Sequence, residues 1–298
     1  MPANETLLLR LAPMIFVFLW ATGFPAAKFS TVDAEPFTFL AARFVIAAAV
    51  LLIYVSLVIR PKNIDWRQVY YSAIIGVLIQ GLYLGGVFFA VYKGMPAGIS
   101  SLAVTLQPFM TAVLAIFVLN ERLSIVRIIC FLFALMGMYL VLFPELDIAK
   151  AIPGVTTLTL AAVAISPIAI SIGTVFQKRL VTSINLWVAT TAQFVGAAIA
   201  MSLLSYLFES QRLEWTLNTV LTMAWLVIVL SVGAVGLLMY LIRRGNSSSV
   251  ASLFFLVPVV SLFMTWVLFG DTMNSVQIFG SVIVVLSVAV STKYGISK

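Results

Sequence analysis

The chain has 298 residues, of which 63% are hydrophobic and only 9% are charged, and its formal net charge is +7. Soluble domains carry about 25% charged residues, and here the apolar residues extend over nearly the whole length, which excludes a soluble domain with one anchor. The basic residues stand singly and in pairs between apolar runs. They therefore indicate membrane topology, and nucleic acid is not an expected partner.

Ten apolar segments follow one another along the chain, each with about the 20 mainly apolar residues that a spanning helix needs. We predict them at 8–28, 36–58, 68–92, 97–119, 123–143, 157–177, 184–207, 219–242, 248–270 and 274–292. The loops between them are short, so we expect no extramembrane domain. The apolar run Leu11–Ala27 of the first segment is followed by Lys28 and not by a small-residue cleavage site, so this segment is expected to be a helix and not a signal peptide.

The basic residues also predict the orientation of the segments. If the N-terminus is cytoplasmic, twelve Lys and Arg residues lie between segments on the inner side and four on the outer side, while Arg43 lies inside a segment. Such a bias follows the positive-inside rule. We therefore predict a multi-pass protein of a bacterial-type inner (plasma) membrane with both termini cytoplasmic.

The second half of the chain repeats the first at an offset of 150 residues. Five positions of the second segment are identical in the seventh: Ala42, Phe44, Val45, Ala47 and Ala48 match Ala192, Phe194, Val195, Ala197 and Ala198. Because each unit holds an odd number of helices, the two units must lie upside down relative to each other. The predicted fold class is an all-α membrane protein of ten transmembrane helices, built as two inverted five-helix repeats at 8–143 and 157–292. Such repeats place a substrate site near the membrane midplane.

Several short motifs mark the helix entries and turns. They are Trp20-Ala-Thr-Gly-Phe-Pro-Ala-Ala-Lys28, Ala34-Glu-Pro-Phe-Thr-Phe-Leu-Ala-Ala-Arg43, Pro96-Ala-Gly-Ile-Ser-Ser-Leu102, Gln107-Pro108 and Asn120-Glu-Arg-Leu123. With these motifs the whole chain resembles the drug/metabolite transporter (DMT) superfamily, and within it the ten-helix exporters built from two EamA domains. The second half departs from the pattern at Gly270-Asp-Thr-Met273, a weaker version of the Asn120 turn. The resemblance implies export of substrates that range from amino acids to drugs, vitamins and nucleotide-linked metabolites.

Arg43 is the sharpest single candidate for a binding residue. It lies seven residues after Pro36, inside a predicted helix, where a charge costs at least a few kcal/mol. In one interpretation it faces a cavity and meets a substrate carboxylate or phosphate. In the other it snorkels outward and pairs with Asp33 or Glu35. The sequence leaves both interpretations open.

Amide side chains inside the predicted helices form a second group of candidates. Gln80, Gln107 and Gln193 can hold polar substrate groups or bond neighbouring helices, and Gln193 stands at the repeat position of Arg43. Gln177, at the end of its segment, is expected near the surface. Gln80 and Gln193 are the stronger candidates for a cavity.

Two aromatic side chains lie too deep in their segments for the interfacial belts in which most membrane Trp and Tyr residues are found. These are Trp20 and Tyr83. They are candidates for stacking on an aromatic or cationic substrate, with packing in the helix bundle as the alternative.

Four prolines inside predicted helices are candidates for hinges. Pro25, Pro108, Pro167 and Pro258 each remove a backbone hydrogen bond and should kink or break a helix. Pro108 and Pro258 stand at matching positions of the two repeats, which favours a gating bend at this pair.

The sequence also lacks the groups that several kinds of chemistry require. It has no histidine, and its carboxylates all fall at predicted helix ends or in loops, so we expect no metal site, no cofactor and no enzyme activity. If transport is coupled to protons, Glu121 and Asp271 at repeat-related helix ends are the carboxylates available. Capping of helix ends is the alternative role for these two residues, and a facilitator or exchanger is an equal alternative to coupling.

These observations predict a secondary transporter that moves small organic metabolites by alternating access, as an exporter of amino acids or aromatic metabolites. The alternatives are an importer of a riboflavin-like vitamin or nucleotide-like metabolite, an exporter of drugs or quaternary cations, and, more distantly, a membrane-embedded enzyme. The expected partners are a small-molecule substrate and the lipid bilayer. The protein is expected as a monomer or a homodimer, with its cavity between helices one to four and six to nine.

Overall fold

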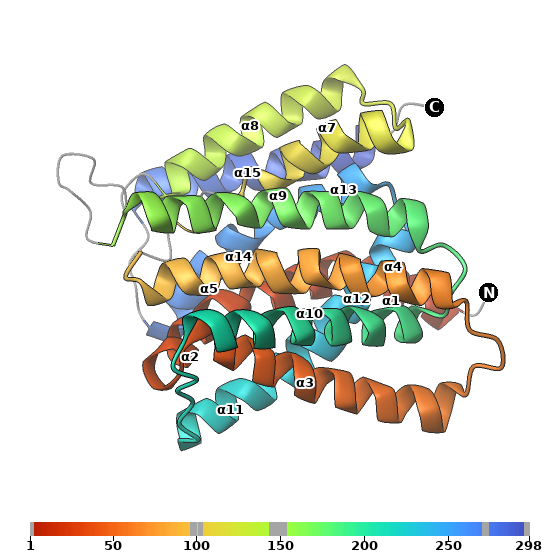
Figure 1. Ribbon diagram of the computed structural model, residues 1–298. Coiled ribbons are helices and arrows are strands. Elements are labelled where there is room, and N and C mark those ends of the chain that lie inside the picture. Colours follow the sequence, from red (N-terminus) through yellow and green to blue (C-terminus); the bar gives the residue numbers. More distant parts are fainter. Residues whose placement is uncertain (1–2, 96–99, 101–103, 143–153, 270–273, 295–298) are drawn as a thin grey trace.

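The computed structural model describes residues 3–95, 100, 104–142, 154–269 and 274–294. These residues form a single bundle of helices that lie roughly side by side (Figure 1). Helix α1 (Ala3–Ala21) begins and helix α15 (Ser275–Tyr294) ends at the same end of the bundle. We name this the termini end, and the other the opposite end.

The helices of the first half follow the predicted segments closely. After α1 they are α2 (Gly23–Asp33), α3 (Pro36–Tyr54) with the π-helical η1 (Val55–Ile59), α4 (Trp66–Gly76), the π-helical η2 (Val77–Leu82), α5 (Tyr83–Tyr92), α7 (Gln107–Leu119) and α8 (Ile125–Leu142). A π-helix inserts an extra residue into a turn, and such segments occur frequently at functional sites.

The second half has the same plan. Its helices are α9 (Thr157–Leu180), α10 (Leu186–Phe208), α11 (Leu217–Trp225), the π-helical η4 (Leu226–Ala234), α12 (Val235–Arg244), α13 (Ser247–Ser252), the 3₁₀ turn η5 (Leu253–Phe255), α14 (Leu256–Phe269) and α15. The segments η2 and η4 fall at matching positions of the two repeats, and each interrupts the third helix of its unit.

Ten apolar helical stretches occupy the ten predicted segments. Five are continuous and long enough to cross a membrane: Pro36–Ile59, Trp66–Tyr92, Thr157–Leu180, Leu186–Phe208 and Leu217–Arg244. Five shorter apolar stretches fall on the other segments: Leu11–Ala21, Gln107–Leu119, Ile125–Val141, Ser249–Val260 and Ser275–Ser291. The chain is an all-α membrane protein of ten transmembrane helices in two inverted repeats.

The shorter stretches reflect breaks that the sequence pattern does not fully predict. At the first predicted segment, 8–28, the observed helical structure continues to Asp33, but it is interrupted at Thr22, between α1 and α2. The ninth changes to a 3₁₀ turn at η5, directly before the helix that carries Pro258. In the fourth, a turn at 105–106 precedes α7, whose first turn holds Pro108. A proline fits the first turn of a helix because its missing N–H would have no partner there.

The packing of the helices has the two-fold pattern of inverted repeats. Helix α3 packs along its repeat mate α10, and α8 packs along its mate α15. Helix α9 packs on α5 and α7, and its mate α1 packs on η4 and α14. The main apolar core lies between the repeats, whereas α8 and α15 contribute to a smaller cluster of their own. Pairing across the repeats thus holds the two units together.

Helices α4 and α10 cross with almost no space between their backbones. A Cβ atom at Gly76 would lie 2.0 Å from the carbonyl oxygen of Gln193, and one at Gly196 would lie 2.1 Å from that of Ala73. Both approaches are to backbone atoms, which cannot rotate away. Glycine is therefore required at both positions of this crossing.

At the opposite end, the loop between α2 and α3 binds the loop between α10 and α11. Ala34 pairs with Leu213 in one antiparallel bridge. The N–H of Glu35 donates to the carbonyl oxygen of Arg212 at 3.0 Å, and the N–H of Glu214 donates to that of Asp33 at 3.0 Å. We name residues 33–38 with 209–219 the loop bracket, since they join the first repeat to the second.

Three carboxylates complete the loop bracket. Asp33 accepts hydrogen bonds from Thr216, Asn218 and Thr219, Glu35 accepts from Ser210 and Arg212, and Glu209 accepts from the N–H groups of Phe37 and Thr38. Glu209 thereby caps the N-terminus of α3, where the helix dipole also favours a negative charge.

The stability of the loop bracket should depend on pH. Hydrogen bonds from Thr216 and Asn218 lower the pKa of Asp33, and hydrogen bonds from Arg212 and Ser210 outweigh burial and lower the pKa of Glu35. A lowered folded-state pKa gives stability that is complete above the ordinary carboxyl value of about 4 and is lost as the pH falls through the lowered value.

We expect the melting temperature of the wild type to fall between about pH 5 and pH 3. The D33N/E35Q variant should melt lower than the wild type at pH 7 and lose less on acidification. E214Q is the matched control, because Glu214 is largely exposed on the same loop. If the melting temperatures of the wild type and of D33N/E35Q fell by the same amount between pH 5 and pH 3, this result would contradict the prediction.

Candidate functional site

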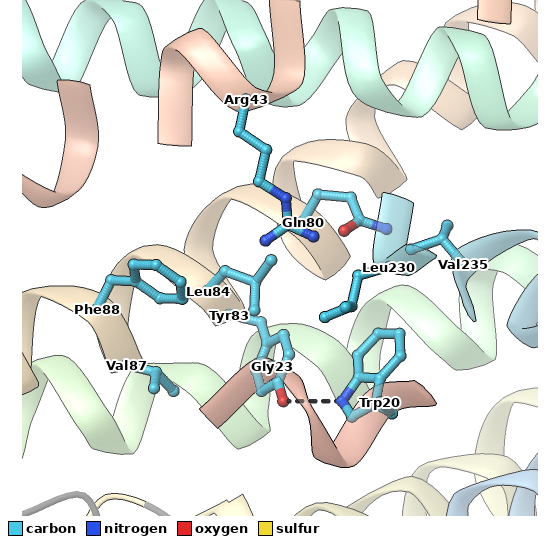
Figure 2. A pocket seen from close by; sticks show the side chains of 10 residues that line it. All are labelled: Trp20, Gly23, Arg43, Gln80, Tyr83, Leu84, Val87, Phe88, Leu230 and Val235. Atoms are coloured by element: carbon cyan, nitrogen blue, oxygen red, sulfur yellow. Dashed lines mark hydrogen bonds between the residues drawn. The ribbon is translucent and has the colours of Figure 1, made fainter. Parts of the chain in front are cut away.

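A cavity lies between the first, second, third and eighth transmembrane helices, in the half of the bundle towards the opposite end (Figure 2). Its lining residues are Trp20, Gly23, Arg43, Gln80, Tyr83, Leu84, Val87, Phe88, Leu230 and Val235. The cavity volume that is accessible to water is about 30 Å³. This is room for water but not for a metabolite, so a substrate requires the helices to move apart.

Arg43 is the positive charge of this cavity. Its side chain is 2% exposed, and its Nε donates to the hydroxyl of Ser231 at 3.2 Å. Within the described ranges it forms no ion pair, since Asp33 and Glu35 are bound in the loop bracket. The structure thus places Arg43 in the cavity wall and not in an outward pair with Asp33 or Glu35. A buried cation without a counter-ion is costly and favours an anionic ligand.

Gln80 lies beside the Arg43 guanidinium (Figure 2). It is fully buried on η2, and neither its amide nitrogen nor its amide oxygen has a hydrogen-bond partner among the residues that the structure describes. Leaving such groups unpaired costs about 1–3 kcal/mol each. Because Gln80 lines the cavity, a ligand with a donor and an acceptor could bond its amide group.

Trp20 and Tyr83 form an aromatic wall of the cavity. Their rings are stacked with centroids 6.4 Å apart, and the Trp20 Nε1 donates a long hydrogen bond of 3.5 Å to the Tyr83 hydroxyl. Both residues also line a second, smaller cavity with Thr105 and Pro258. The two cavities thus share these two rings, and the second cavity is also lined by residues of the fourth and ninth helices.

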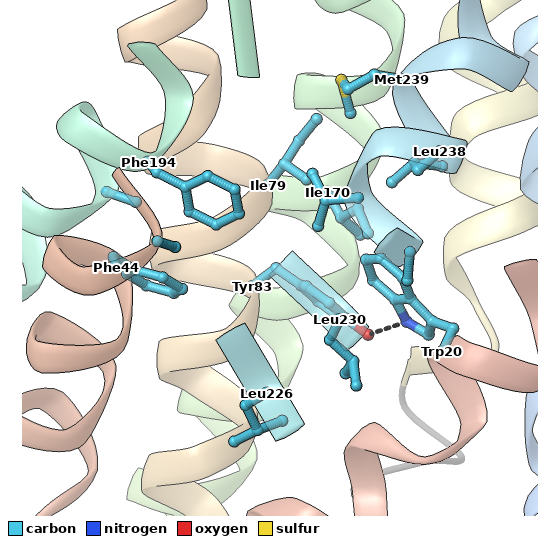
Figure 3. Close-up of a cluster of buried hydrophobic side chains, with 14 of the residues drawn as sticks. Trp20, Phe44, Ile79, Tyr83, Ile170, Phe194, Leu226, Leu230, Leu238 and Met239 are labelled. Atoms are coloured by element: carbon cyan, nitrogen blue, oxygen red, sulfur yellow. Dashed lines mark hydrogen bonds between the residues drawn. The ribbon is translucent and has the colours of Figure 1, made fainter. Parts of the chain in front are cut away.

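Close-packed apolar side chains fill the bundle between the cavity and the termini end (Figure 3). They include Ile79, Ile170, Phe194, Leu238 and Met239, all fully buried. Leu238 and Met239 lie in the middle of α12, one turn further towards the termini end than the cavity residue Val235. We name these five residues the apolar plug, because they close the site towards the termini end.

The other candidate amides lie apart from the described cavity lining. Gln193 donates to the Gln177 side-chain oxygen at 2.8 Å and approaches the Met239 sulfur at 3.2 Å, so it joins helices beside the apolar plug. Gln177 is 1% exposed, which corrects the expectation of a surface position. Gln107 is buried at the start of α7, where its carbonyl oxygen accepts from Ser171 and its side-chain amide has no partner. No described residue of the sixth or seventh helix lines either cavity.

The four candidate prolines have different settings. Pro25 and Pro108 lie in the first turns of α2 and α7, and Pro258 lies in the first turn of α14. Pro167, by contrast, lies within α9, which continues through it as a helix from Thr157 to Leu180. Helix breaks therefore precede both repeat-related prolines, Pro108 and Pro258, whereas the helix is not broken at Pro167.

Glu121 lies at the termini end, far along α7 from the cavity. Its carboxylate accepts from the N–H of Ser247 at 2.9 Å and so caps the first turn of α13. Its repeat mate Asp271 lies outside the described residues. In the described part of the chain, no cluster of Cys, Asp and Glu side chains is arranged to hold a metal ion.

Ser231 is the site residue that sequence reasoning missed. It is fully buried on η4 and is the hydrogen-bond partner of Arg43. Its only sequence signal is a small polar residue within the apolar run Leu226–Ala234, and such residues usually serve helix packing.

Two inverted repeats with a charged cavity between them define the class of this protein, which is a membrane transporter. The chain belongs to the EamA-like transporter family, whose model matches residues 9–143 and 157–293. It is thereby a transporter of the drug/metabolite superfamily.

The sequence of this chain is similar to those of several transporters over most of the length of both proteins. The chain is 26% identical to a "Probable amino-acid metabolite efflux pump" of Salmonella typhimurium over 91% of this chain and 90% of that protein. It is 24% identical to a protein of the same name from Escherichia coli, again over 91% and 90%. An "Uncharacterized transporter" of Archaeoglobus fulgidus is 27% identical over 91% and 94%. One crystal structure has the same fold, with a TM-score of 0.76 and 22% identity over 95% of both chains.

Proposed function

We propose that this protein exports small organic anions, among them amino-acid-derived and aromatic carboxylates, by alternating access. The observation that carries the proposal is the buried Arg43, which lines a cavity and forms no ion pair with any described residue. A substrate carboxylate would neutralise it and gain a charge-assisted hydrogen bond, worth about 1.5–3 kcal/mol. The names of the two efflux-pump relatives support the same kind of substrate.

The other lining residues have complementary roles in this proposal. Gln80 offers both a donor and an acceptor to polar substrate groups, and Trp20 with Tyr83 offers flat apolar surface for a ring. The side-chain amide of Gln107 also has no partner among the described residues, but Gln107 lines neither cavity and would meet substrate only after movement. In this proposal Gln193 does not bind substrate, and it joins α10 to α9 beside the apolar plug through its hydrogen bond to Gln177.

In the proposed cycle the two units, 8–143 and 157–292, rock against each other. With both termini cytoplasmic, the present conformation holds its site towards the outside of an inner membrane and is closed inside by the apolar plug. The breaks before Pro108 and Pro258 are the proposed hinges. Because Glu121 serves as a helix cap, a facilitated or exchange mechanism fits better than coupling through this carboxylate.

Arg43 also favours a second candidate, the import of a phosphate-bearing or nucleotide-like metabolite. A guanidinium recognises a phosphate as well as it recognises a carboxylate, so the site alone does not fix the direction of transport. Export of quaternary cations fits less well, because Arg43 would repel them in a medium of low dielectric constant.

The proposal can be tested with the purified protein in lipid vesicles. Saturable flux is expected for phenylpyruvate and phenylalanine, both of which carry a carboxylate, and not for tetraethylammonium. R43Q should remove most of this flux. Flux of tetraethylammonium alone, or of none of the three probes, would overturn the proposal.

A further inference from the structure

We infer that Ser231 is a positioning residue, which aims Arg43 into the cavity and ties the strength of anion binding to the relative position of the two repeats. The inference rests on the proposed function. Its basis is the contact between Arg43 Nε and Ser231 Oγ at 3.2 Å, which joins α3 of the first repeat to η4 of the second. Both side chains are buried, with 2% and 0% exposure.

The chemistry of a guanidinium gives this contact its effect. The planar group carries one N–H on Nε and four on its two Nη atoms. Ser231 takes the Nε donor, so the end of the guanidinium with the two Nη atoms is left for the cavity, where Gln80 and Tyr83 lie (Figure 2). Two parallel N–H groups at that end match the two oxygens of a carboxylate. Without the Ser231 hydroxyl, a long side chain with several free torsions would lose this direction.

The second repeat shows that the fold itself does not require the contact. At the related crossing of α10 with η2, the position of Arg43 is taken by Gln193 and the position of Ser231 by Gly81. Gln193 bonds Gln177 of α9 instead. The two halves therefore build the same helix crossing, and only one of them contains the arginine and serine pair. This asymmetry favours a role in the site over a role in packing.

The position of the pair couples binding to movement. Arg43 and Ser231 lie on different repeats, so a displacement of η4 relative to α3 by more than about 1 Å would break a hydrogen bond that is already 3.2 Å long. Arg43 would then lose its fixed direction. Anion affinity is expected to be highest in the present arrangement and lower once the repeats move, which would help to release the substrate.

Equilibrium binding of two matched probes to the purified full-length protein tests this inference. Phenylacetate is an anion, and phenylacetamide is its neutral counterpart of nearly the same shape. We expect S231A to weaken phenylacetate binding roughly tenfold while phenylacetamide binding stays within about twofold. S231T, which keeps the hydroxyl, should restore phenylacetate binding. S72A is the control, because Ser72 is an equally buried serine whose hydroxyl bonds its own helix.

A double variant separates positioning from general structural damage. If Ser231 acts through Arg43, R43Q/S231A should bind phenylacetate no more weakly than R43Q alone. Additive losses, or equal losses for both probes in S231A, would overturn the inference. Should S231A be unstable, S231C gives the same test, since a thiol is a poor acceptor. If R43Q leaves phenylacetate binding unchanged, the proposed function fails, whatever Ser231 does.

Discussion

Replacing Arg43 by glutamine is expected to weaken the binding of organic anions roughly a hundredfold, yet to leave the ligand-free protein at least as stable as the wild type. The first effect follows from the loss of charge-assisted hydrogen bonds worth about 3 kcal/mol. The second follows from the setting of Arg43, which is buried and forms no ion pair in the described part of the chain. Removing a buried charge without a counter-ion removes a cost.

The opposite signs of these two effects distinguish a binding residue from a structural one. Thermal melting of the purified protein, with and without phenylacetate, measures both. Wild type should melt higher when the anion is present, because a ligand stabilises the state that binds it, and R43Q should show no such shift. R43K keeps the charge but not the planar fork, so it should bind with intermediate strength. A marked fall in the melting temperature of ligand-free R43Q would assign Arg43 a structural role.

Replacing Gly76 or Gly196 by alanine is expected to be the most damaging small change in the fold. A methyl group at either position would overlap the backbone of the facing helix, at 2.0 Å and 2.1 Å respectively. Helices α4 and α10 would have to move apart along a crossing that joins the two repeats. Overpacking of this kind costs about 1–3 kcal/mol, and occasionally more.

The crossing also predicts how the two changes combine. One displacement of α10 would relieve both overlaps, so G76A/G196A should cost less than the sum of the single variants. The fraction of protein that elutes as a single species after heating in detergent measures these losses. G81A is the matched control, because the nearest atom to a Cβ there would be the end of the Met201 side chain at 3.5 Å, an ordinary van der Waals contact. Equal behaviour of G76A, G196A and G81A would show that the crossing is not close in the membrane.

The architecture was largely predictable because it depends on features that repeat along the chain. Segment lengths are set by the thickness of the bilayer, and the identities between 42–48 and 192–198 fix the two-unit plan. The breaks and π-helical segments were less accessible. Both η2 and η4 lie within long, mainly apolar runs of sequence, so no change in hydrophobic pattern marks where the helix winds differently.

The candidate site was predictable only where depth in the membrane was informative. Arg43, Gln80, Trp20 and Tyr83 stood out as polar or aromatic residues far from helix ends, and the structure brings them to one cavity. Gln193 was expected in the cavity, but it bonds Gln177 of another helix, and this tertiary contact could not be inferred from spacing.

Ser231 was missed for a related reason. A single serine in an apolar helix is common, and what gives this one a role is the arginine opposite, on a helix almost two hundred residues earlier in the chain. Local sequence contains no information about such a pairing.

The central claim is that a carboxylate binds Arg43 within the cavity walled by Trp20 and Tyr83. The most direct test is a crystal structure of the protein with 4-bromophenylacetate, in which the anomalous signal of bromine locates the ring. We predict one bromine peak beside Trp20 and Tyr83, with carboxylate density at the Nη atoms of Arg43. A bromine peak elsewhere, or no peak in this cavity at a saturating concentration, would contradict the claim.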